Sequence, residues 1–166
     1  MVAISFDRNL WITGAAAIRD LTRESYAPWV ALIGREPLPM TADYEAAARA
    51  HRFDLAYLEG NIVALIETRA EPDHLLVVNV AVKPAVQGQG VGRRLLAHAE
   101  QLALEQGLAE LRLYTNVAFE RNVRLYQGLG YVIDRERISE LRTTVHMSKR
   151  LDAPRRYPEV DVVRQG

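Results

Sequence analysis

Three glycines lie close together near the middle of the chain, at Gly88, Gly90 and Gly92. They follow an apolar run rich in β-branched residues and precede a helical pattern. The first amides of a helix lack intrahelical partners, and the helix dipole adds positive potential there. Glycines also let the backbone approach an anion without interference from a Cβ atom. With Arg93 and Arg94 at the same helix end, the turn predicts a binding site for phosphate groups.

Two common phosphate-binding motifs do not fit this turn. A P-loop ends in Gly-Lys-Ser/Thr, whereas Gly92 is followed by two arginines. A dinucleotide fingerprint needs G-x-G-x-x-G, and the third glycine position counted from Gly88 holds Arg93. A nucleotide-binding protein is therefore disfavoured. A glycine-rich connection without a ligand is the remaining alternative, but it gives no reason for three glycines within five residues.

Two stretches together resemble a known enzyme family. Gln87, Gly90 and Gly92 form Q-x-x-G-x-G after the segment VAVKP, which is similar to the acyl-CoA pyrophosphate loop of the Gcn5-related N-acetyltransferases. The segment 113–133 resembles the second signature of that family, N-x-x-L-Y-x-x-x-G-Y. Its matching residues are Asn122, Leu125, Tyr126, Gly130 and Tyr131. The resemblance covers residues 53–151.

This resemblance implies a fold and a reaction. The fold is α/β (α+β), with a mixed central β-sheet flanked by helices on both faces and splayed central strands, the acyl-CoA N-acyltransferase fold. The co-substrate is acetyl-CoA, and an amine attacks its thioester directly. CoA leaves as a thiolate, which benefits from a positioned proton donor. The lack of cysteine agrees with direct transfer, because no acyl-cysteine intermediate can form.

The family resemblance also assigns roles to residues. By its place in the second signature, Tyr126 is the expected proton donor, since a tyrosine hydroxyl stays neutral at pH 7. Packing of the Tyr126 ring in the core is compatible with that role. Asn116 and Asn122 are expected beside the pantetheine arm, although Asn116 is equally suited to cap the following helix. The residues expected to bind the cofactor are Val80, Ala81, Val82, Gln87, Gly88, Gln89, Gly90, Val91, Gly92, Arg93, Asn116, Asn122 and Tyr126.

The group that accepts the proton of the attacking amine is less defined. Glu67 and Asn79 lie on neighbouring expected strands and are candidate catalytic residues. Glu67 could act directly or through a water, whereas Asn79 could only position one. Glu120 and His146 are weaker candidates. For all four, a solvated or structural polar role is the competing interpretation.

Substrate choice in the family depends largely on the first two helices, their loop and the last strands. Here the first of these regions is ESYAPWVALIGREPLPMTADY. Tyr26 and Trp29 could hold an apolar or cationic amine, and Arg35 could pair with a carboxylate. The alternative is that both aromatic rings simply pack the helix on the sheet. The expected acceptor is a primary amine of a small molecule or an amino acid derivative.

The elements that must position these residues follow from the hydrophobic pattern. Two helices are expected in the first third, separated by a loop at REPLPM, which contains two prolines. The first has an interruption near Pro28, and the second has an N-cap at Thr41 or Asp43. A hairpin and a buried strand come next, followed by a helix over 91–106 that ends at Gly107. A strand, a short helix and an antiparallel pair complete the domain.

Length and composition set the remaining expectations. The 166 residues suit one domain, expected over 1–151, with 152–166 as a C-terminal extension. Lys and Arg number 21, as do Asp and Glu, so no basic excess indicates a nucleic-acid partner. Without cysteine, and with four scattered histidines, no metal site is expected. No apolar run suits a membrane span or a signal peptide, so a soluble cytoplasmic protein is expected.

The leading hypothesis is therefore an acetyl-CoA-dependent N-acetyltransferase, and a homodimer through the last strands is expected from the family. One alternative is an enzyme that acetylates a protein lysine or N-terminus. Another, from a different class, is a non-catalytic acyl-CoA-binding sensor or partner protein. The presence of Tyr126 favours an enzyme.

Overall fold

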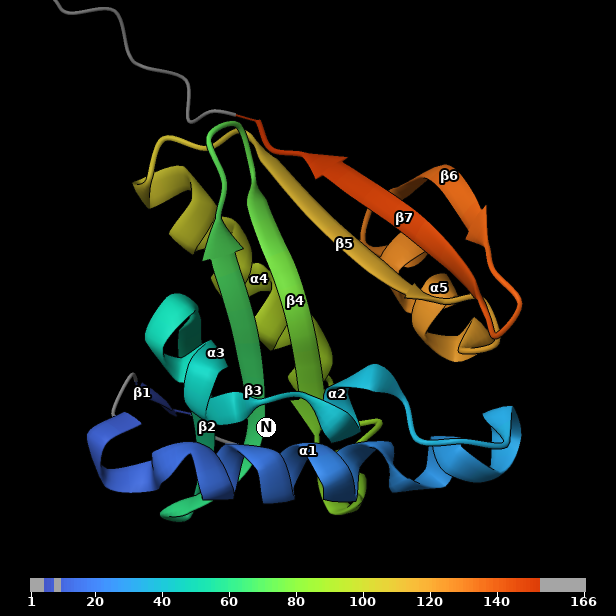
Figure 1. Cartoon of the computed structure of the whole chain (residues 1–166). Helices are drawn as coiled ribbons and strands as arrows, with labels where there is room; N and C mark the ends of the chain where they lie inside the picture. Colours follow the sequence, from blue (N-terminus) through green and yellow to red (C-terminus); the bar gives the residue numbers. More distant parts are fainter. Residues whose placement is uncertain (1–4, 8–9, 153–166) are drawn as a thin grey trace, which may run out of the picture.

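The computed structural model describes residues 5–7 and 10–152. A seven-stranded sheet runs through the molecule in the order β1-β2-β3-β4-β5-β7-β6 (Figure 1). The strands are β1 (Ser5–Asp7), β2 (Arg52–Leu58), β3 (Asn61–Ala70), β4 (Leu75–Val82), β5 (Glu110–Asn116), β6 (Val132–Ile138) and β7 (Thr143–Arg150). The helices are α1 (Leu10–Ile33), α2 (Leu38–Thr41), α3 (Tyr44–Ala50), η1 (Pro84–Val86), α4 (Val91–Glu105) and α5 (Glu120–Gly128). The predicted mixed sheet is confirmed.

The central strands β4 and β5 separate along their length. They are the parallel pair, and only Leu75–Val77 and Leu111–Leu113 are in register. Beyond these residues β4 continues to Val82 and β5 to Asn116 without pairing with each other. Figure 1 shows the two strands diverging toward α1 and α2. The predicted splay therefore opens the sheet at its centre and leaves strand backbone facing the gap.

Helices cover both faces of the sheet, and each face has its own apolar core. On one face α4 buries Leu95, Leu96 and Ala99 against strands that include β3, β4 and β5. On the other face α1 buries Ile18 and Leu21 beside Phe53 and Leu65. Burial of this apolar surface is the main stabilising contribution to such a three-layer arrangement.

A β-bulge in β4 changes which face its residues address. Glu67 pairs with Asn79 and Thr68 pairs with Val77, so Val78 is an extra residue in the strand. As a result Val77 packs in the α4-side core, whereas Ala81 packs in the α1-side core. The bulge thereby turns Asn79 toward α1 and α3, where it bonds with tyrosines of both helices.

Two local predictions about the N-terminal region are wrong. Pro28 does not interrupt α1, which continues to Ile33, and the backbone instead leaves helical geometry at Gly14 (φ 66°, ψ 160°). Pro28 is exposed, so water can satisfy the carbonyl that loses its intrahelical partner. The predicted loop at REPLPM contains the short helix α2, and the three-residue strand β1 was not predicted. Such short elements give no readable periodicity.

Other local predictions are confirmed. Asp43 caps α3, and its side chain accepts hydrogen bonds from Glu45 N and Ala46 N at 3.1 and 3.0 Å. Gly107 follows α4 with φ +72°, as expected of a glycine at a helix C-terminus. No helix among the residues that the structure describes is long and apolar enough to cross a membrane.

Candidate active site

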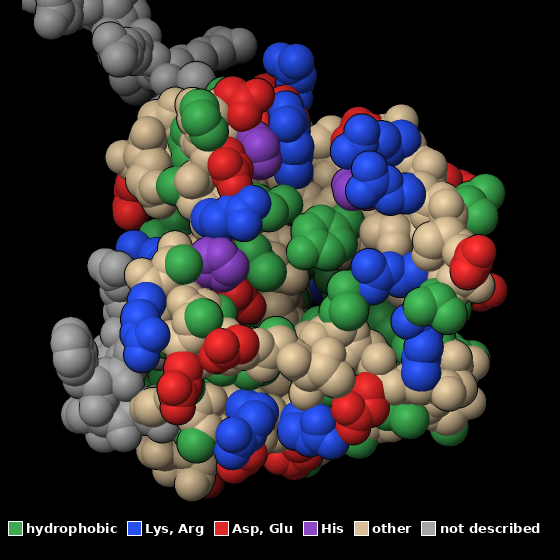
Figure 2. Space-filling view, viewed as in Figure 1, with side chains coloured by type: hydrophobic (Ala, Val, Ile, Leu, Met, Phe, Trp, Pro, Cys, Tyr) green, Lys and Arg blue, Asp and Glu red, His purple; other side chains and the backbone are tan. Residues whose placement is uncertain are grey.

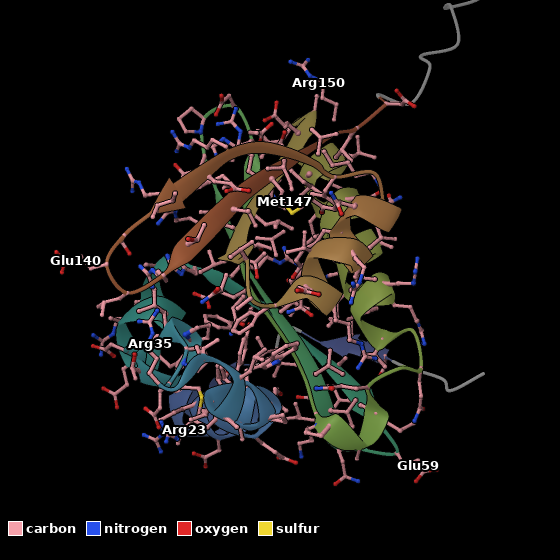
Figure 3. The ribbon with its side chains drawn as sticks, turned by 90° about the vertical axis from the view of Figure 1, so that its right-hand side faces the viewer. Arg23, Arg35, Glu59, Glu140, Met147 and Arg150 are labelled. Atoms are coloured by element: carbon pink, nitrogen blue, oxygen red, sulfur yellow. The ribbon has the colours of Figure 1, made fainter. Side chains whose placement is uncertain are left out.

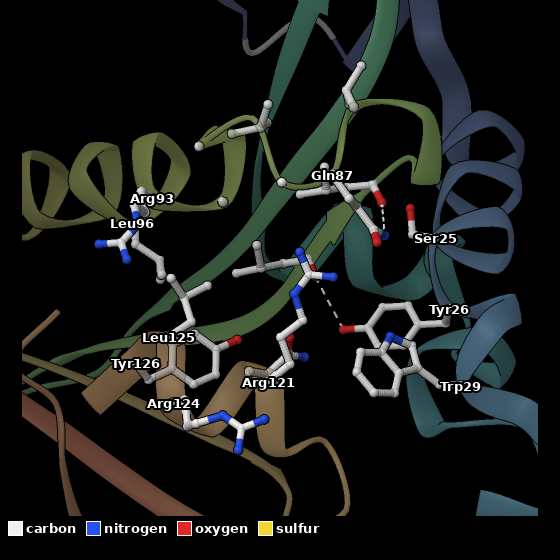
Figure 4. A pocket seen from close by; sticks show the side chains of 18 residues that line it. Ser25, Tyr26, Trp29, Gln87, Arg93, Leu96, Arg121, Arg124, Leu125 and Tyr126 are labelled. Atoms are coloured by element: carbon white, nitrogen blue, oxygen red, sulfur yellow. Dashed lines mark hydrogen bonds between the residues drawn. The ribbon is translucent and has the colours of Figure 1, made fainter. Parts of the chain in front are cut away.

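A cavity of about 470 Å³ lies where β4, the glycine turn, α4, α5 and α1 meet (Figure 4). We call it the first cavity. It is lined by Ser25, Tyr26, Trp29, Val80, Val82, Val86, Gln87, Gly88, Gly90, Val91, Gly92, Arg93, Leu96, Arg121, Asn122, Arg124, Leu125 and Tyr126. Both sequence motifs therefore contribute to one hollow, although residues 93–121 separate them along the chain.

The glycine turn forms the wall of the first cavity that suits an anion. Gly88 and Gly90 have φ values of +76° and +80°, which side chains with a Cβ rarely adopt. Gly90 is the N-cap of α4, and no side chain of the described residues caps that helix start. The first amides of α4 therefore lack a side-chain partner within the described part of the chain. The helix dipole adds positive potential at the same place.

Arginines from two helices surround this wall. Arg93 comes from α4, and Arg121 and Arg124 come from α5. The Arg121 guanidinium extends to the glycine turn, where its Nη2 lies 3.8 Å from the position a Cβ on Gly88 would take. Arg121 and Arg124 were not predicted from the sequence. Their basic character was visible, but nothing local to α5 indicated that they face a turn thirty residues earlier.

Tyr126 projects from α5 into the first cavity (Figure 4). Its hydroxyl makes no hydrogen bond with any described residue. Burial raises the pKa of Tyr126 to about 12, because a phenolate would lose hydration. The hydroxyl thus keeps its proton at neutral pH and can donate it to a group in the cavity.

Tyr26 faces Tyr126 from α1 on the opposite wall, and Figure 4 shows both hydroxyls directed into the space between them. The Tyr26 hydroxyl lies 2.9 Å from Asn79 Oδ1, to which it donates, and 3.3 Å from the carbonyl oxygen of Val80. Burial, and then the proximity of Tyr126, raise the Tyr26 pKa well above its usual value near 10. Tyr26 is therefore a fixed neutral group at the wall of the cavity.

A second cavity of about 350 Å³ shares Tyr26 with the first. Its other lining residues are Ile33, Arg35, Pro37, Leu38, Pro39, Val78, Tyr114, Thr115, Asn116, Phe119, Arg137, Ser139, Arg142, Thr144 and His146. Figure 2 shows a hollow near the middle of this face, with hydrophobic side chains beside it and Lys or Arg side chains on the side of β5–β7. The two cavities thus adjoin at one tyrosine.

His146 lies in the second cavity, with its ring centroid 5.9 Å from that of Tyr114. Burial lowers the pKa of His146, and the positive charges of Arg135 and Arg137 lower it further, against a smaller opposing effect of Asp134. The imidazole is therefore neutral at pH 7 and able to accept a proton.

The predicted site residues divide into three groups. Most of the predicted cofactor residues, together with Tyr26 and Trp29, line the first cavity. Tyr26, Arg35 and Asn116 line the second, where Asn116 Oδ1 also accepts a hydrogen bond from Ala118 N at 2.9 Å. Glu67, Asn79, Ala81 and Gln89 line neither cavity.

Glu67 is buried behind the cavities rather than in them. Its Oε1 lies 2.5 Å from Nδ1 of His51, and only 4% of Glu67 is exposed. Burial raises the Glu67 pKa, while the hydrogen bond and charge of His51 act against that rise. Asn79 contacts a residue that lines both cavities, because its Oδ1 accepts a hydrogen bond from the Tyr26 hydroxyl. Its Nδ2 donates to the Tyr44 hydroxyl at 3.3 Å.

Comparison with known proteins identifies this arrangement. A model of the Acetyltransferase (GNAT) family matches residues 15–131, which is more than half of the chain. The chain belongs to the GNAT family of acetyltransferases. The matched segment contains the glycine turn and extends to the end of the second signature. The predicted family and the predicted N-acetyltransferase class of enzyme are therefore confirmed.

Individual relatives support the same assignment. The chain is 29% identical over 113 residues to the [ribosomal protein bS18]-alanine N-acetyltransferase of Escherichia coli strain K12, covering 58% of this chain and 76% of that protein. The fold is similar to that of the E. coli enzyme (TM-score 0.73, 21% identity, 95% and 99% coverage). It is also similar to that of the PaiA N-acetyltransferase of Thermoplasma acidophilum in complex with coenzyme A (TM-score 0.77, 17% identity, 89% and 99% coverage).

Proposed function

We propose that this GNAT protein transfers the acetyl group of acetyl-CoA directly to the primary amine of a small molecule. The observation that carries this proposal is the junction of the two cavities. The first cavity is lined by arginines and by the N-terminus of α4, which has no side-chain cap. The second cavity adjoins it, and Tyr26 lines both. The first suits a thioester carrier with phosphate groups, and the second suits the amine that attacks it.

Binding of acetyl-CoA follows from the chemistry of the first cavity. The glycine turn and Arg93 would hold the pyrophosphate through backbone amides and charge. The backbone of Val80–Val82 on the open side of β4 would bond with the pantetheine amides, because β5 does not pair with it there. Asn122 lines the same cavity and would bond with the same arm.

Tyr126 is proposed as the general acid. The amine nitrogen forms a bond with the acetyl carbonyl carbon, the bond from that carbon to sulfur breaks, and the electron pair leaves with sulfur. Tyr126 then donates its proton to the thiolate, the amine nitrogen loses one proton to solvent as the amide forms, and Tyr126 takes up a proton from solvent again. Its raised pKa keeps the hydroxyl protonated before the reaction, which a proton donor requires.

The positions of the other polar groups refine the acid–base proposal. Asn79 is proposed as a positioning residue, because it holds the Tyr26 hydroxyl at the cavity junction. Since Glu67 lines neither cavity, its carboxylate could receive the amine proton only through intervening groups or water. His146 is the titratable group of the second cavity whose lowered pKa leaves it neutral near pH 7.

A protein N-terminus is the second candidate acceptor, favoured by the E. coli relative that modifies an alanine of bS18. A contact at the second cavity favours a small molecule instead. Arg35 Nη2 donates to the carbonyl oxygen of Leu141 at 2.8 Å and joins the segment after α1 to the β6–β7 turn. This bond joins two segments that line the second cavity, and an entrance narrowed in this way would favour a small acceptor over an extended peptide.

The first experiment is a thermal-shift comparison with acetyl-CoA, CoA, ATP and NAD. A ligand at about 100 times its Kd adds about 2.7 kcal/mol of stability, or on the order of 5–10 °C for a domain of this size. We expect a shift with acetyl-CoA and CoA alone. Thiol release is then measured with small amines and with a peptide that begins with alanine. The chain has no cysteine, so the protein contributes no thiol signal.

The outcomes separate the candidates. Faster release with small amines than with the peptide supports the proposal, and the reverse supports N-terminal acetylation of a protein. Binding of acetyl-CoA without release from any acceptor would contradict both and support a non-catalytic acyl-CoA-binding protein. A shift with ATP or NAD would contradict the cofactor assignment.

A further inference from the structure

We infer that the acceptor carries a carboxylate in addition to its primary amine, and that arginines of the second cavity bind that carboxylate. This inference rests on the proposed function and specifies its substrate class. It follows from the charges of the cavity wall. Arg35, Arg137 and Arg142 line the cavity, and none of its lining residues is an aspartate or a glutamate.

These arginines differ from many others in the chain because they have no acidic partner among the residues that the structure describes. Arg23, Arg52 and Arg112 each pair with a carboxylate, with nitrogen–oxygen distances of 2.6, 2.7 and 2.5 Å. By contrast, Arg137 and Arg142 make no ion pair with any residue in the described ranges. Arg35 donates one guanidinium N–H group to the Leu141 carbonyl, and its other N–H groups stay available. Unpaired guanidinium groups around a hollow recognise carboxylate or phosphate bidentately.

The three arginines come from separate parts of the fold, yet one contact holds two of those parts together. Arg35 lies after α1, Arg137 is on β6, and Arg142 is in the β6–β7 turn. The bond from Arg35 to Leu141, one residue before Arg142, fixes the first part against the third. Figure 3 shows Glu140, at the tip of that turn, directed away from the molecule. Glu140, the acidic residue nearest in sequence to Arg142, therefore does not neutralise that arginine.

The rest of the wall defines the body of the acceptor. Ile33, Pro37, Val78 and Phe119 are apolar, and Tyr26 marks the end that adjoins the first cavity. An acceptor with its amine toward Tyr26, its carboxylate at the arginines and its apolar group against the apolar part of the wall would satisfy all three regions. An amino acid with an apolar side chain has this composition, and a cavity of about 350 Å³ is within the usual range for small ligands.

The same charges would select against acceptors that have no carboxylate. Positive groups disfavour a second positive charge close to them, and only a bound carboxylate offsets that repulsion. A polyamine, by contrast, would meet repulsion without a compensating carboxylate.

The test compares L-phenylalanine, L-phenylalaninamide and 2-phenylethylamine as acceptors for the full chain with saturating acetyl-CoA. They share one apolar group and differ in charge. We expect kcat/KM for the acid to exceed that for the amide and the amine by at least about tenfold, within the usual effect of charge-assisted hydrogen bonds. The amide has the less basic amine, so preference for the acid cannot come from amine deprotonation.

Variants connect the preference to the arginines. Arg137→Gln and Arg142→Gln should each lower kcat/KM for the acid by roughly 10- to 100-fold and change the amide by less than about twofold. Arg150→Gln, an exposed arginine at the end of β7, is the matched control and should change neither. Equal kcat/KM for the three acceptors, or equal losses for all of them in the variants, would overturn the inference.

A binding measurement separates failure of this inference from failure of the proposed function. N-acetyl-L-phenylalanine and its amide are titrated by calorimetry into the protein saturated with CoA. Tighter binding of the acid, lost in Arg142→Gln, supports the carboxylate site even if no acceptor releases thiol. Equal binding of the two overturns the inference whatever the turnover. The phosphonate analogue of phenylalanine is included in both assays to show which anion the arginines prefer. A preference for the phosphonate over the carboxylate would also overturn the inference.

Discussion

The two cavities of this protein are built from very different stretches of sequence. The first takes most of its wall from 80–96 and 121–126, and much of its chemistry comes from backbone amides and glycine geometry. The second collects single residues from α1, the following loop, β4, β5, the approach to α5, β6 and β7. The difference teaches that a site made by one turn is specified locally, whereas a site made by strand register is specified only by the whole fold.

The largest expected effect tests whether the first cavity holds chemistry as well as cofactor. Tyr126→Phe should lower kcat by roughly 10- to 1000-fold, because it removes the proposed proton donor, and should leave the Kd of acetyl-CoA within about twofold. Thiol release and calorimetry measure the two quantities. Tyr131→Phe is the control, since the buried Tyr131 hydroxyl has no described partner and lines neither cavity. Unchanged turnover in Tyr126→Phe would remove Tyr126 from the mechanism.

The next effect concerns the glycine turn itself. Gly90→Val should raise the Kd of acetyl-CoA by about 10- to 100-fold, because a branched side chain at φ +80° both strains the backbone and approaches the phosphate position. Gly107→Val at the other end of α4 is the matched control, with φ +72° and the same open surroundings. Both variants should lose about 1–2 kcal/mol of unfolding free energy. Equal cofactor affinity in the two variants would show that the turn does not hold the phosphates.

The features that could be predicted from the sequence are again those specified by a short stretch of residues. Helix α4 and the glycine turn could be predicted because periodicity and glycine spacing act over a few residues, whereas the splay of the sheet was implied only by the family resemblance. The continuation of α1 through Pro28 could not, because it depends on that residue being exposed. The bulge at Val78 could not be predicted either, although it determines that Asn79 faces α1.

Within the candidate site the same limit separates Arg35 from Arg137 and Arg142. Arg35 was predicted to bind substrate because it belongs to a proline-rich segment with aromatic neighbours. Arg137 and Arg142 lie in a hairpin with several arginines, and the sequence alone does not show which of them face inward. The folded hairpin brings both to the second cavity, with Arg137 opposite Thr144 in β7 and Arg142 in the turn.

A smaller effect is expected at the junction of the cavities. Tyr26→Phe leaves Asn79 Oδ1 without its hydroxyl donor in a buried site, which should cost about 1–3 kcal/mol of unfolding free energy. We also expect a rise of about three- to tenfold in the acceptor KM, because the group shared by both cavities is lost. Tyr114→Phe, whose hydroxyl has no described partner, should keep its stability. Denaturant unfolding that shows equal stability for the two variants would contradict the role of Asn79.

The smallest expected effect is a change in one pKa, and it probes the positive charge of the second cavity directly. Burial, with Arg135 and Arg137, holds the His146 pKa below 6.5, so NMR titration of its ring protons should give a midpoint below that value. Below pH 6.5 the unfolded chain binds a proton there more readily than the folded chain. The free energy of unfolding should therefore fall as the pH falls through this window.

Changing the charges around His146 should move its pKa in a predictable direction. Arg137→Gln should raise it by a fraction of a pKa unit, because one positive neighbour is lost. Arg150→Gln should not, since Arg150 is not among the groups that shift His146. A carboxylate bound at the arginines should also raise it, whereas a neutral amide should have no such effect. An unchanged midpoint in Arg137→Gln would show that the charge of this arginine does not act on the interior of the second cavity. The two cavities would then not differ as proposed, with backbone amides binding the cofactor in the first and arginine charge binding the acceptor in the second.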